Sequence, residues 1–391
     1  MKRFQVPFVP ALVVPAIVAL ALAGVALVSS TAQAQKTAYK IGAIFDVTGP
    51  ASPLGTPEQE TVKMLVKQIN AKGGIDGHPL EVVYYDNGSD EAKSLMAMKK
   101  LIEADKVLAI IGPSQTGTTL AGAQTVETAN IPLVSCAAGV GIVEPVKPWI
   151  FKTAQSDVHA VKKVLDYCQA KRYARVALIT VANAFGDSGK KQVELQARGA
   201  RVSVVARESF GSNDTDMKAQ LMRIRQSNAQ AVICWGTNPG PAIVAKNMKE
   251  LGIRLPLLMS HGIANRKFIE LAGPAAEGVI FPAGKLLIAD TLPNTDPQKR
   301  VLQAYAADFK KTYGKEADTF GGHAYDALML VCRALRAVGP DKAKLRAELE
   351  KTKGFVGISG VFSFSAKDHN GLNEDAFAMV IIKNGDWTRL K

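Results

Sequence analysis

The 391-residue sequence has few cysteines, and none of them stands at a metal-ligand spacing. Cys136, Cys168, Cys234 and Cys332 lie far apart, each within a largely apolar segment. There is no CxxC pair and no Cys/His cluster, which argues against the common zinc-binding and thiol-redox motifs. Four cysteines allow three disulfide pairings, and the apolar surroundings favour buried free thiols. We therefore expect no metal site.

The sequence also lacks the loops that bind nucleotides or dinucleotide cofactors or that carry a catalytic serine. No GxGxxG follows the first expected strand, and neither a Walker loop nor a GxSxG elbow is present. The five histidines show no metal-ligand spacing. His261 directly follows an expected strand and His323 stands early in a long expected helix, so both are candidate ligand contacts. These absences argue against an enzyme, and we expect no cofactor.

Positive charge is in excess, but it is not concentrated anywhere along the chain. The net charge is +13, to which Lys2 and Arg3 contribute two. The basic residues are scattered, and the stretch 341–353 mixes both signs. No dense basic block and no alternation of basic and aromatic residues is present, so we expect no nucleic-acid partner. The pattern indicates a solvated surface with mild attraction for anions.

Only one stretch is apolar for long enough to enter a membrane, and it stands at the N-terminus. Residues 9–28 carry no charge, and Ala32 and Ala34 occupy the two small-residue positions that signal peptidase reads. We predict a signal peptide over 1–34, cleavage before Gln35, and export to the periplasm. An uncleaved anchor is the alternative, because the run is long enough to span a bilayer. Two prolines near the start of the run and the cleavage site itself argue against that alternative.

The remaining 357 residues exceed what one hydrophobic core usually spans, and they alternate short apolar strands with amphipathic helices. Expected strands are 39–45, 80–85, 107–111, 132–135, 176–180, 202–206, 231–235, 257–259, 361–364 and 377–382. Expected helices are 56–71, 92–104, 118–128, 159–170, 188–197, 217–226, 242–251, 295–313, 318–338 and 342–351. This order predicts two doubly wound α/β lobes with parallel sheets, linked around 149–156. Ligands bind outside the carboxyl ends of such strands, so facing lobes form a cleft.

Two loops that follow expected strands have the composition of a binding site. Residues 110–119 run from a strand into a helix, and their hydroxyl and N–H groups suit a carboxylate at a helix N-terminus. Ordinary N-capping by serine or threonine is the alternative for this loop. The small residues of 135–141 would let a ligand approach the backbone closely.

Several segments resemble the periplasmic leucine/isoleucine/valine-binding proteins. The most specific is the glycine-rich segment 69–80, followed by Asp86; weaker matches are 41–50, 110–113 and 276–279. The resemblance covers essentially the whole chain after the signal peptide. It implies a type I periplasmic-binding fold in which three strands cross between the lobes. It also implies an inner-membrane ABC permease as partner and no chemistry on the ligand.

The same resemblance implies lobe boundaries and ligand contacts. The first lobe would comprise 36–154 and 285–354, and the second 155–284 and 355–391. By this pattern Thr116 would hold the ligand carboxylate through its hydroxyl, beside the backbone of the following loop. The expected ligand contacts are Leu54, Thr116, Ala137, Ala138, Gly139, Phe185, Thr237, Asn238 and His261.

Four of these positions depart from the pattern of amino-acid binders, and the first is Gly139, which stands where a threonine is usual. Leu54 and Phe185 stand where a tyrosine is common, and His261 stands where an acidic residue binds the ligand ammonium. An ammonium buried without that partner costs on the order of 3–5 kcal/mol. The segment 260–262 is similar to binders of aromatic carboxylates. We therefore predict a substrate-binding protein for uptake of a small carboxylate, with an aromatic acid favoured. Branched-chain amino-acid binding, a periplasmic sensor subunit and an enzyme on two Rossmann-like lobes are the alternatives.

Overall fold

The computed structural model describes residues 1–5, 7 and 36–390. The predicted signal peptide lies almost entirely outside these residues, and so does its cleavage site. The chain from Ala38 onward forms one compact unit. No helix in the part of the chain that the structure describes combines the length and the apolar character that a membrane span requires.

The first sheet has five parallel strands in the order β2-β1-β3-β4-β5. Its strands are β1 (Tyr39–Phe45), β2 (Leu80–Asp86), β3 (Ile110–Ile111), β4 (Leu133–Ser135) and β5 (Ile150–Lys152). The helices between them are α1 (Ser52–Ala71), α2 (Glu91–Glu103) and α3 (Thr116–Ala129). β1 is apolar almost throughout because both faces of the sheet are covered, and Ile41 and Phe45 are fully buried.

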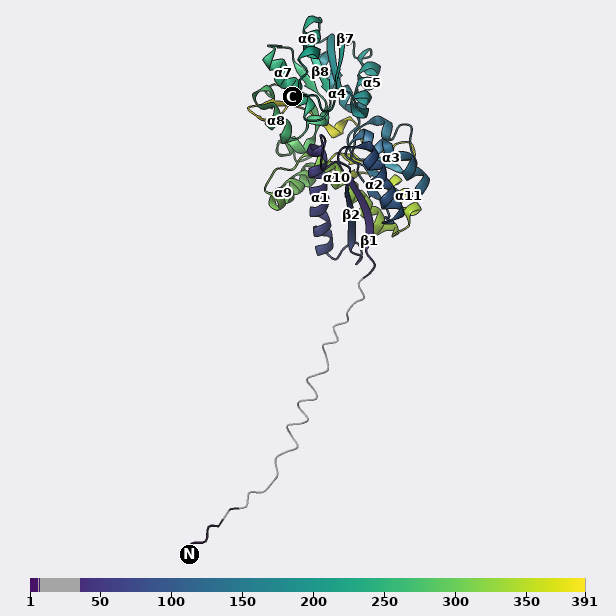
Figure 1. Ribbon diagram of the computed structural model, residues 1–391, viewed down its shortest axis with the longest axis vertical. Coiled ribbons are helices and arrows are strands. Elements are labelled where there is room, and N and C mark those ends of the chain that lie inside the picture. Colours follow the sequence, from purple (N-terminus) through teal and green to yellow (C-terminus); the bar gives the residue numbers. More distant parts are fainter. Residues whose placement is uncertain (6, 8–35, 391) are drawn as a thin grey trace. The chain divides into compact units, whose positions relative to one another are not determined.

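The second sheet has seven strands in the order β14-β13-β10-β9-β8-β6-β7. Its strands are β6 (Arg175–Val181), β7 (Ser203–Phe210), β8 (Ala231–Trp235), β9 (Leu257–Met259), β10 (Ile280–Gly284), β13 (Phe377–Lys383) and β14 (Asp386–Arg389). Its helices are α4 (Asp157–Ala170), α5 (Ala184–Ala197), α6 (Lys218–Gln226), α7 (Gly240–Glu250) and α8 (Arg266–Ala272). Figure 1 shows α4 to α7 around this sheet. The first five strands are parallel, whereas β13 and β14 add to the edge in antiparallel fashion.

The chain crosses between the two sheets three times. It leaves the first sheet after β5, returns after β10, and crosses again before β13. The segment between β10 and β13 contains α9 (Lys299–Tyr313), α10 (Thr319–Val338), α11 (Lys342–Glu350) and the small hairpin of β11 (Phe355–Val356) and β12 (Val361–Phe362). Short 3-10 helices are η1 (Val140–Ile142), η2 (His261–Ile263), η3 (Gly273–Ala275), η4 (Lys285–Thr291) and η5 (Glu374–Ala376). Because α10 packs against α1, this segment contributes to the first sheet's lobe. The predicted fold class, two doubly wound lobes joined by crossing strands, is confirmed.

Both sheets repeat one topology. The strand order β7-β6-β8-β9-β10 in the second sheet is that of β2-β1-β3-β4-β5 in the first. In such a sheet the chain turns in opposite directions on either side of the first strand, and this point leaves room for a ligand at the carboxyl ends. The loops after β3 and β4, and those after β6, β8 and β9, are therefore the expected walls of a site.

Some local predictions need correction. The helix expected from residue 295 begins at Lys299, because the backbone turns between Pro293 and Asp296 and the Asp296 carboxylate accepts a hydrogen bond from the Gln298 N–H. The expected linker 149–156 contains β5, an edge strand of the first sheet. β10, β14 and α8 were not predicted. Each is short, so neither a period of 2 nor a period of 3.6 residues is evident.

The four cysteines are buried free thiols. Burial raises the pKa of Cys168 and of Cys332 to about 12, so neither is a thiolate at neutral pH. They behave as small apolar residues of the core.

Candidate functional site

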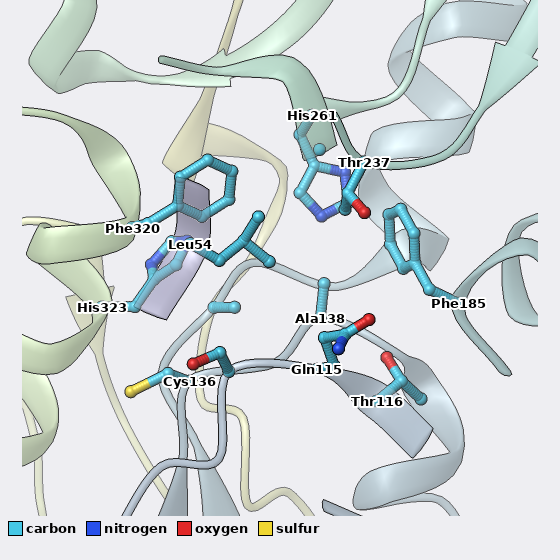
Figure 2. Close-up of a pocket in the computed structure, with 13 residues that line it drawn as sticks. Leu54, Gln115, Thr116, Cys136, Ala138, Phe185, Thr237, His261, Phe320 and His323 are labelled. Atoms are coloured by element: carbon cyan, nitrogen blue, oxygen red, sulfur yellow. The ribbon is translucent and has the colours of Figure 1, made fainter. Parts of the chain in front are cut away.

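A small cavity lies between the loops of the two sheets, where the shared topology predicts a site. Its volume is about 30 Å³. Figure 2 shows the residues around it. They are Leu54, Ser114, Gln115, Thr116, Cys136, Ala138, Ala154, Phe185, Thr237, His261, Gly262, Phe320 and His323. Most of them follow the carboxyl ends of strands, and Leu54, Phe320 and His323 lie near the starts of α1 and α10.

Thr116 links two loops of the first sheet. It is the first residue of α3, and its hydroxyl oxygen accepts a hydrogen bond of 3.1 Å from the backbone N–H of Gly139. A Cβ atom at position 139 would lie 2.4 Å from Thr116 Cγ2, so any larger residue at this position would require Thr116 to shift. Because the hydroxyl accepts from the backbone, its own proton remains available to an anion in the cavity.

Phe185, from the second sheet's lobe, forms an aromatic part of the cavity wall. It stands in the first turn of α5, where the Asn183 side chain caps the helix by accepting hydrogen bonds from the N–H groups of Phe185 and Gly186. The Phe185 ring meets the His261 ring edge-on, with centroids 5.6 Å apart. Trp235 stands behind both rings, with its centroid 6.0 Å from that of His261. These rings give this part of the cavity an apolar, aromatic wall.

His261 is held in place by its neighbour. The Ser260 hydroxyl donates to the Gly236 carbonyl at 2.8 Å and accepts from the Gly262 N–H at 3.2 Å, which ties the loop after β9 to the loop after β8. Figure 2 shows the imidazole at the cavity, opposite Ala138. Within the described chain, neither ring nitrogen has a hydrogen-bond partner. Burial, together with the charges of His323 and Lys152, lowers the pKa of His261 to about 3. The ring is therefore neutral and offers one donor and one acceptor.

α10 contributes the opposite wall. Phe320 and His323 lie three residues apart and hence on one face of the helix. His323 Nδ1 lies 2.8 Å from the Ser359 hydroxyl, so Nε2 is the nitrogen left for the cavity. Burial, followed by the charge of Lys152, lowers the pKa of His323 to about 3. Both imidazoles at the site are thus uncharged at neutral pH.

A buried cation stands directly behind the wall. Lys152, the last residue of β5, is fully buried, and its ammonium donates to the carbonyl oxygens of Ala138 at 2.9 Å and Ala154 at 3.1 Å. Both alanines line the cavity. Burial lowers the pKa of Lys152 to about 8, against the opposing effect of nearby Asp157, so the side chain is still mostly charged at pH 7. The buried Asp157 carboxylate, whose pKa burial raises to about 6, offsets part of this charge, and the remainder favours an anion on the Ala138 side of the cavity.

Polar side chains of the loop after β3 form another part of the wall. Gln115 Nε2 donates to a carboxylate oxygen of Asp46, and the Ser114 hydroxyl donates to Glu58. The Asp46 backbone N–H in turn donates to the Ser114 hydroxyl at 3.0 Å. Asp46 and Glu58 are fully buried, and burial raises the pKa of Asp46 to about 6 and that of Glu58 above its usual range. The two acids lie behind the wall and do not themselves line the cavity.

The structure brings six of the nine expected contacts to the cavity: Leu54, Thr116, Ala138, Phe185, Thr237 and His261. Ala137, Gly139 and Asn238 do not line it in this conformation. The Ala137 N–H donates to the Ser135 hydroxyl at 3.1 Å, and the Asn238 amide donates to Asn265 at 3.2 Å.

Several lining residues were not predicted. Gln115 and Cys136 stand in the two loops that were predicted to bind the ligand. They could have been predicted as well, because they lie next to Thr116 and close to Ala138 in the sequence. Phe320 and Ala154 had no such signal, because only the tertiary structure places the start of α10 and the end of β5 at the cleft. The described chain also contains no group of three or more histidine, cysteine or acidic side chains that could bind a metal ion.

Comparisons with known proteins agree with this architecture. A family model described as periplasmic binding protein matches residues 38–386. A leucine-, isoleucine-, valine-, threonine- and alanine-binding protein of Pseudomonas aeruginosa is 24% identical over 352 residues, 89% of this chain and 90% of the relative. The leucine-specific-binding protein of Salmonella typhimurium is 23% identical and covers 75% of this chain and 78% of its own.

Solved structures show the same fold. An extracellular ligand-binding receptor from Rhodopseudomonas palustris HaA2 superposes with a TM-score of 0.86 at 24% identity, covering 91% of this chain and 100% of its own. A branched-chain amino acid transporter substrate binding protein from Streptococcus pneumoniae, in complex with isoleucine, gives a TM-score of 0.80 at 27% identity, with 91% and 100% coverage. The chain belongs to the periplasmic binding protein family, in the branch of type I fold typified by the leucine/isoleucine/valine-binding proteins.

Proposed function

We propose that this protein is the substrate-binding component of an ABC uptake transporter and that it binds a small aromatic carboxylate between its lobes. One observation carries the proposal: the cavity is lined by apolar side chains, aromatic rings, neutral imidazoles and uncharged hydroxyl and amide groups, and no acidic side chain lines it among the described residues. An amino acid would bury its ammonium there without an anionic partner, which is costly. A carboxylate on a flat ring meets no such penalty.

The loops of the first sheet offer the groups that would bind the carboxylate of the ligand. Thr116 offers a hydroxyl proton, and Lys152 places a positive charge behind Ala138. A neutral His261 can donate one further hydrogen bond from the second sheet. The ring can then contact Phe185, at a gain of about 0.5–1.5 kcal/mol beyond simple burial.

The size of the cavity supports lobe motion during binding. A volume of about 30 Å³ holds a water molecule or two, whereas a cavity that binds benzene measures about 150 Å³. The two sheets are joined by crossing segments, and we propose that the two predicted lobes move against each other. The first lobe comprises 36–154 and 285–354, and the second comprises 155–284 and 355–391. An aromatic acid would then enter the separated lobes and hold them together. Small-angle scattering should show compaction when a saturating ligand is added, and an unchanged radius of gyration would contradict this motion.

We further propose delivery to an inner-membrane ABC permease and a periplasmic location, which the family and the predicted signal peptide support. Binding of a branched-chain amino acid is the second candidate, favoured by the names of the relatives from Pseudomonas and Streptococcus. It would require an anionic partner for the ammonium that no lining residue supplies in this conformation.

Isothermal titration calorimetry on the mature protein separates the two candidates. Benzoate, 4-hydroxybenzoate and cinnamate should each be tested beside leucine and isoleucine at pH 7. We expect at least one aromatic acid to bind tighter than leucine by tenfold or more, because tenfold is about 1.4 kcal/mol and a missing ammonium partner costs about 3–5 kcal/mol. Tight leucine binding with no heat from any aromatic acid would refute the ligand class and leave the family assignment intact.

A further inference from the structure

Gln115 stands between the cavity and a buried carboxylate, and this arrangement limits what the cavity can recognise. Asp46 follows β1 directly and is fully buried. One of its carboxylate oxygens accepts a hydrogen bond from Gln115 Nε2 across 69 positions of sequence. The Gln115 side chain also lines the cavity, and Figure 2 shows it beside Ala138 and Thr116.

The carboxylate determines how the Gln115 amide is turned. An ionised carboxylate only accepts hydrogen bonds, so the amide must present its NH₂ group to Asp46. The amide oxygen is then the atom left over, and among the described residues it receives no hydrogen bond. Burial raises the pKa of Asp46 to about 6, opposed by its hydrogen bond from Gln115, so the group is mostly ionised at neutral pH. Glu58 and Asp86 are the other acidic groups that act on it.

We propose that Asp46 holds the Gln115 amide with its oxygen toward the ligand, and that this oxygen accepts a hydrogen bond from a hydroxyl group on the ring of the bound acid. The inference rests on the proposed function and narrows its ligand class to hydroxylated aromatic acids. Gln115 is then a specificity-determining residue, and Asp46 is the residue that positions it. An acid without the hydroxyl leaves the amide oxygen desolvated and unpaired.

A hydroxyl group fits this acceptor better than an ammonium group does. A hydroxyl has one proton to donate, and one neutral acceptor satisfies it. An ammonium has three protons and a full charge, and its burial requires an anion in direct contact. Asp46 Oδ1 and Glu58 Oε1 have no hydrogen-bond partner among the described residues. Both acids are nevertheless fully buried behind the wall, and neither lines the cavity where an ammonium would lie.

The test compares matched ligands in matched variants by calorimetry at pH 7.5. The ligands are benzoate against 3- and 4-hydroxybenzoate, and cinnamate against 4-hydroxycinnamate. Gln115→Met removes the acceptor and keeps the length of the side chain, and Asp46→Asn keeps the acceptor but frees the amide to turn. Gln124→Met, an exposed position of the same helix, is the control. Thermal unfolding of each variant shows whether it is folded.

In the wild type and in Gln124→Met, a hydroxylated acid should bind about tenfold tighter than its parent acid, the range of one buried hydrogen bond. In Gln115→Met this ratio should fall to about one, because the hydroxylated acid loses its acceptor and the parent acid no longer leaves an amide oxygen unpaired. Asp46→Asn should lower this ratio less than Gln115→Met does, because the amide oxygen is still present but is no longer held toward the ligand. A ratio that Gln115→Met leaves unchanged, or a wild-type preference for the parent acids, overturns the inference but not the proposed function. If no aromatic acid binds the wild type, the proposed function fails and the inference fails with it.

Discussion

The hydroxyl of Thr116 is the group at this site whose removal gives the clearest result. In the structure it accepts a hydrogen bond of 3.1 Å from the Gly139 N–H, and its own proton remains free for a ligand carboxylate. The substitution Thr116→Val keeps the branched shape of the side chain and removes both interactions. Two effects of different origin should therefore appear together.

The first effect is on stability. The Gly139 N–H is part of a buried segment, and valine would leave it without an acceptor. An unpaired buried donor costs about 1–3 kcal/mol, so the free energy of unfolding should fall by that amount. The second effect is on binding. A hydrogen bond to a charged group contributes about 1.5–3 kcal/mol, so the affinity for a carboxylate should fall roughly ten- to hundredfold.

The assay has to separate lost recognition from a loosened loop. Calorimetry with an aromatic acid and with its neutral amide, for example benzoate and benzamide, makes the distinction. Thr116→Val should weaken the acid much more than the amide, because only the acid carries a full charge toward the hydroxyl. Thr116→Ser keeps the hydroxyl and should recover most of the acid affinity. If acid and amide lose affinity equally, or if neither loses any, Thr116 acts only as a structural link between two loops.

Three further predictions concern charge and processing. Because His261 has a pKa of about 3 when folded and an ordinary value near 6.5 when unfolded, it contributes stability above pH 6.5 that is lost as the pH falls toward 3. When the pH is lowered from 7 to 5, the free energy of unfolding measured in urea should therefore fall by about 2 kcal/mol more for the wild type than for His261→Gln. Equal decreases in the two proteins would contradict this. Lys152→Met should weaken a carboxylate ligand roughly tenfold and leave its amide unaffected, with recovery in Lys152→Arg; equal losses for both ligands would show that the lysine only supports the backbone. The intact mass of exported protein should correspond to a chain that begins at or within two residues of Gln35, and a full-length chain in the membrane fraction would refute cleavage.

Local sequence patterns predicted most of the fold because they depend only on neighbouring residues. The buried strand β6 is a continuous apolar run, and α10 alternates buried and exposed faces with the helical period. Their order along the chain was sufficient to predict two doubly wound lobes. The edge strand β14 could not be predicted in the same way, since it has four residues and only one face to cover.

The residues of the candidate site can likewise be separated into those that the sequence predicted and those that it did not. Thr116 and His261 could be singled out because each directly follows a strand, and parallel strands place their carboxyl ends at one edge of a sheet. The sequence by itself thus determined the class of protein and the loops that line most of the cavity. It did not show that Asp46 turns the Gln115 amide, or that Lys152 lies behind Ala138. Those contacts, and the burial that keeps His261 neutral, join segments far apart in the chain, and only the tertiary structure decides which of them meet and how much water they retain.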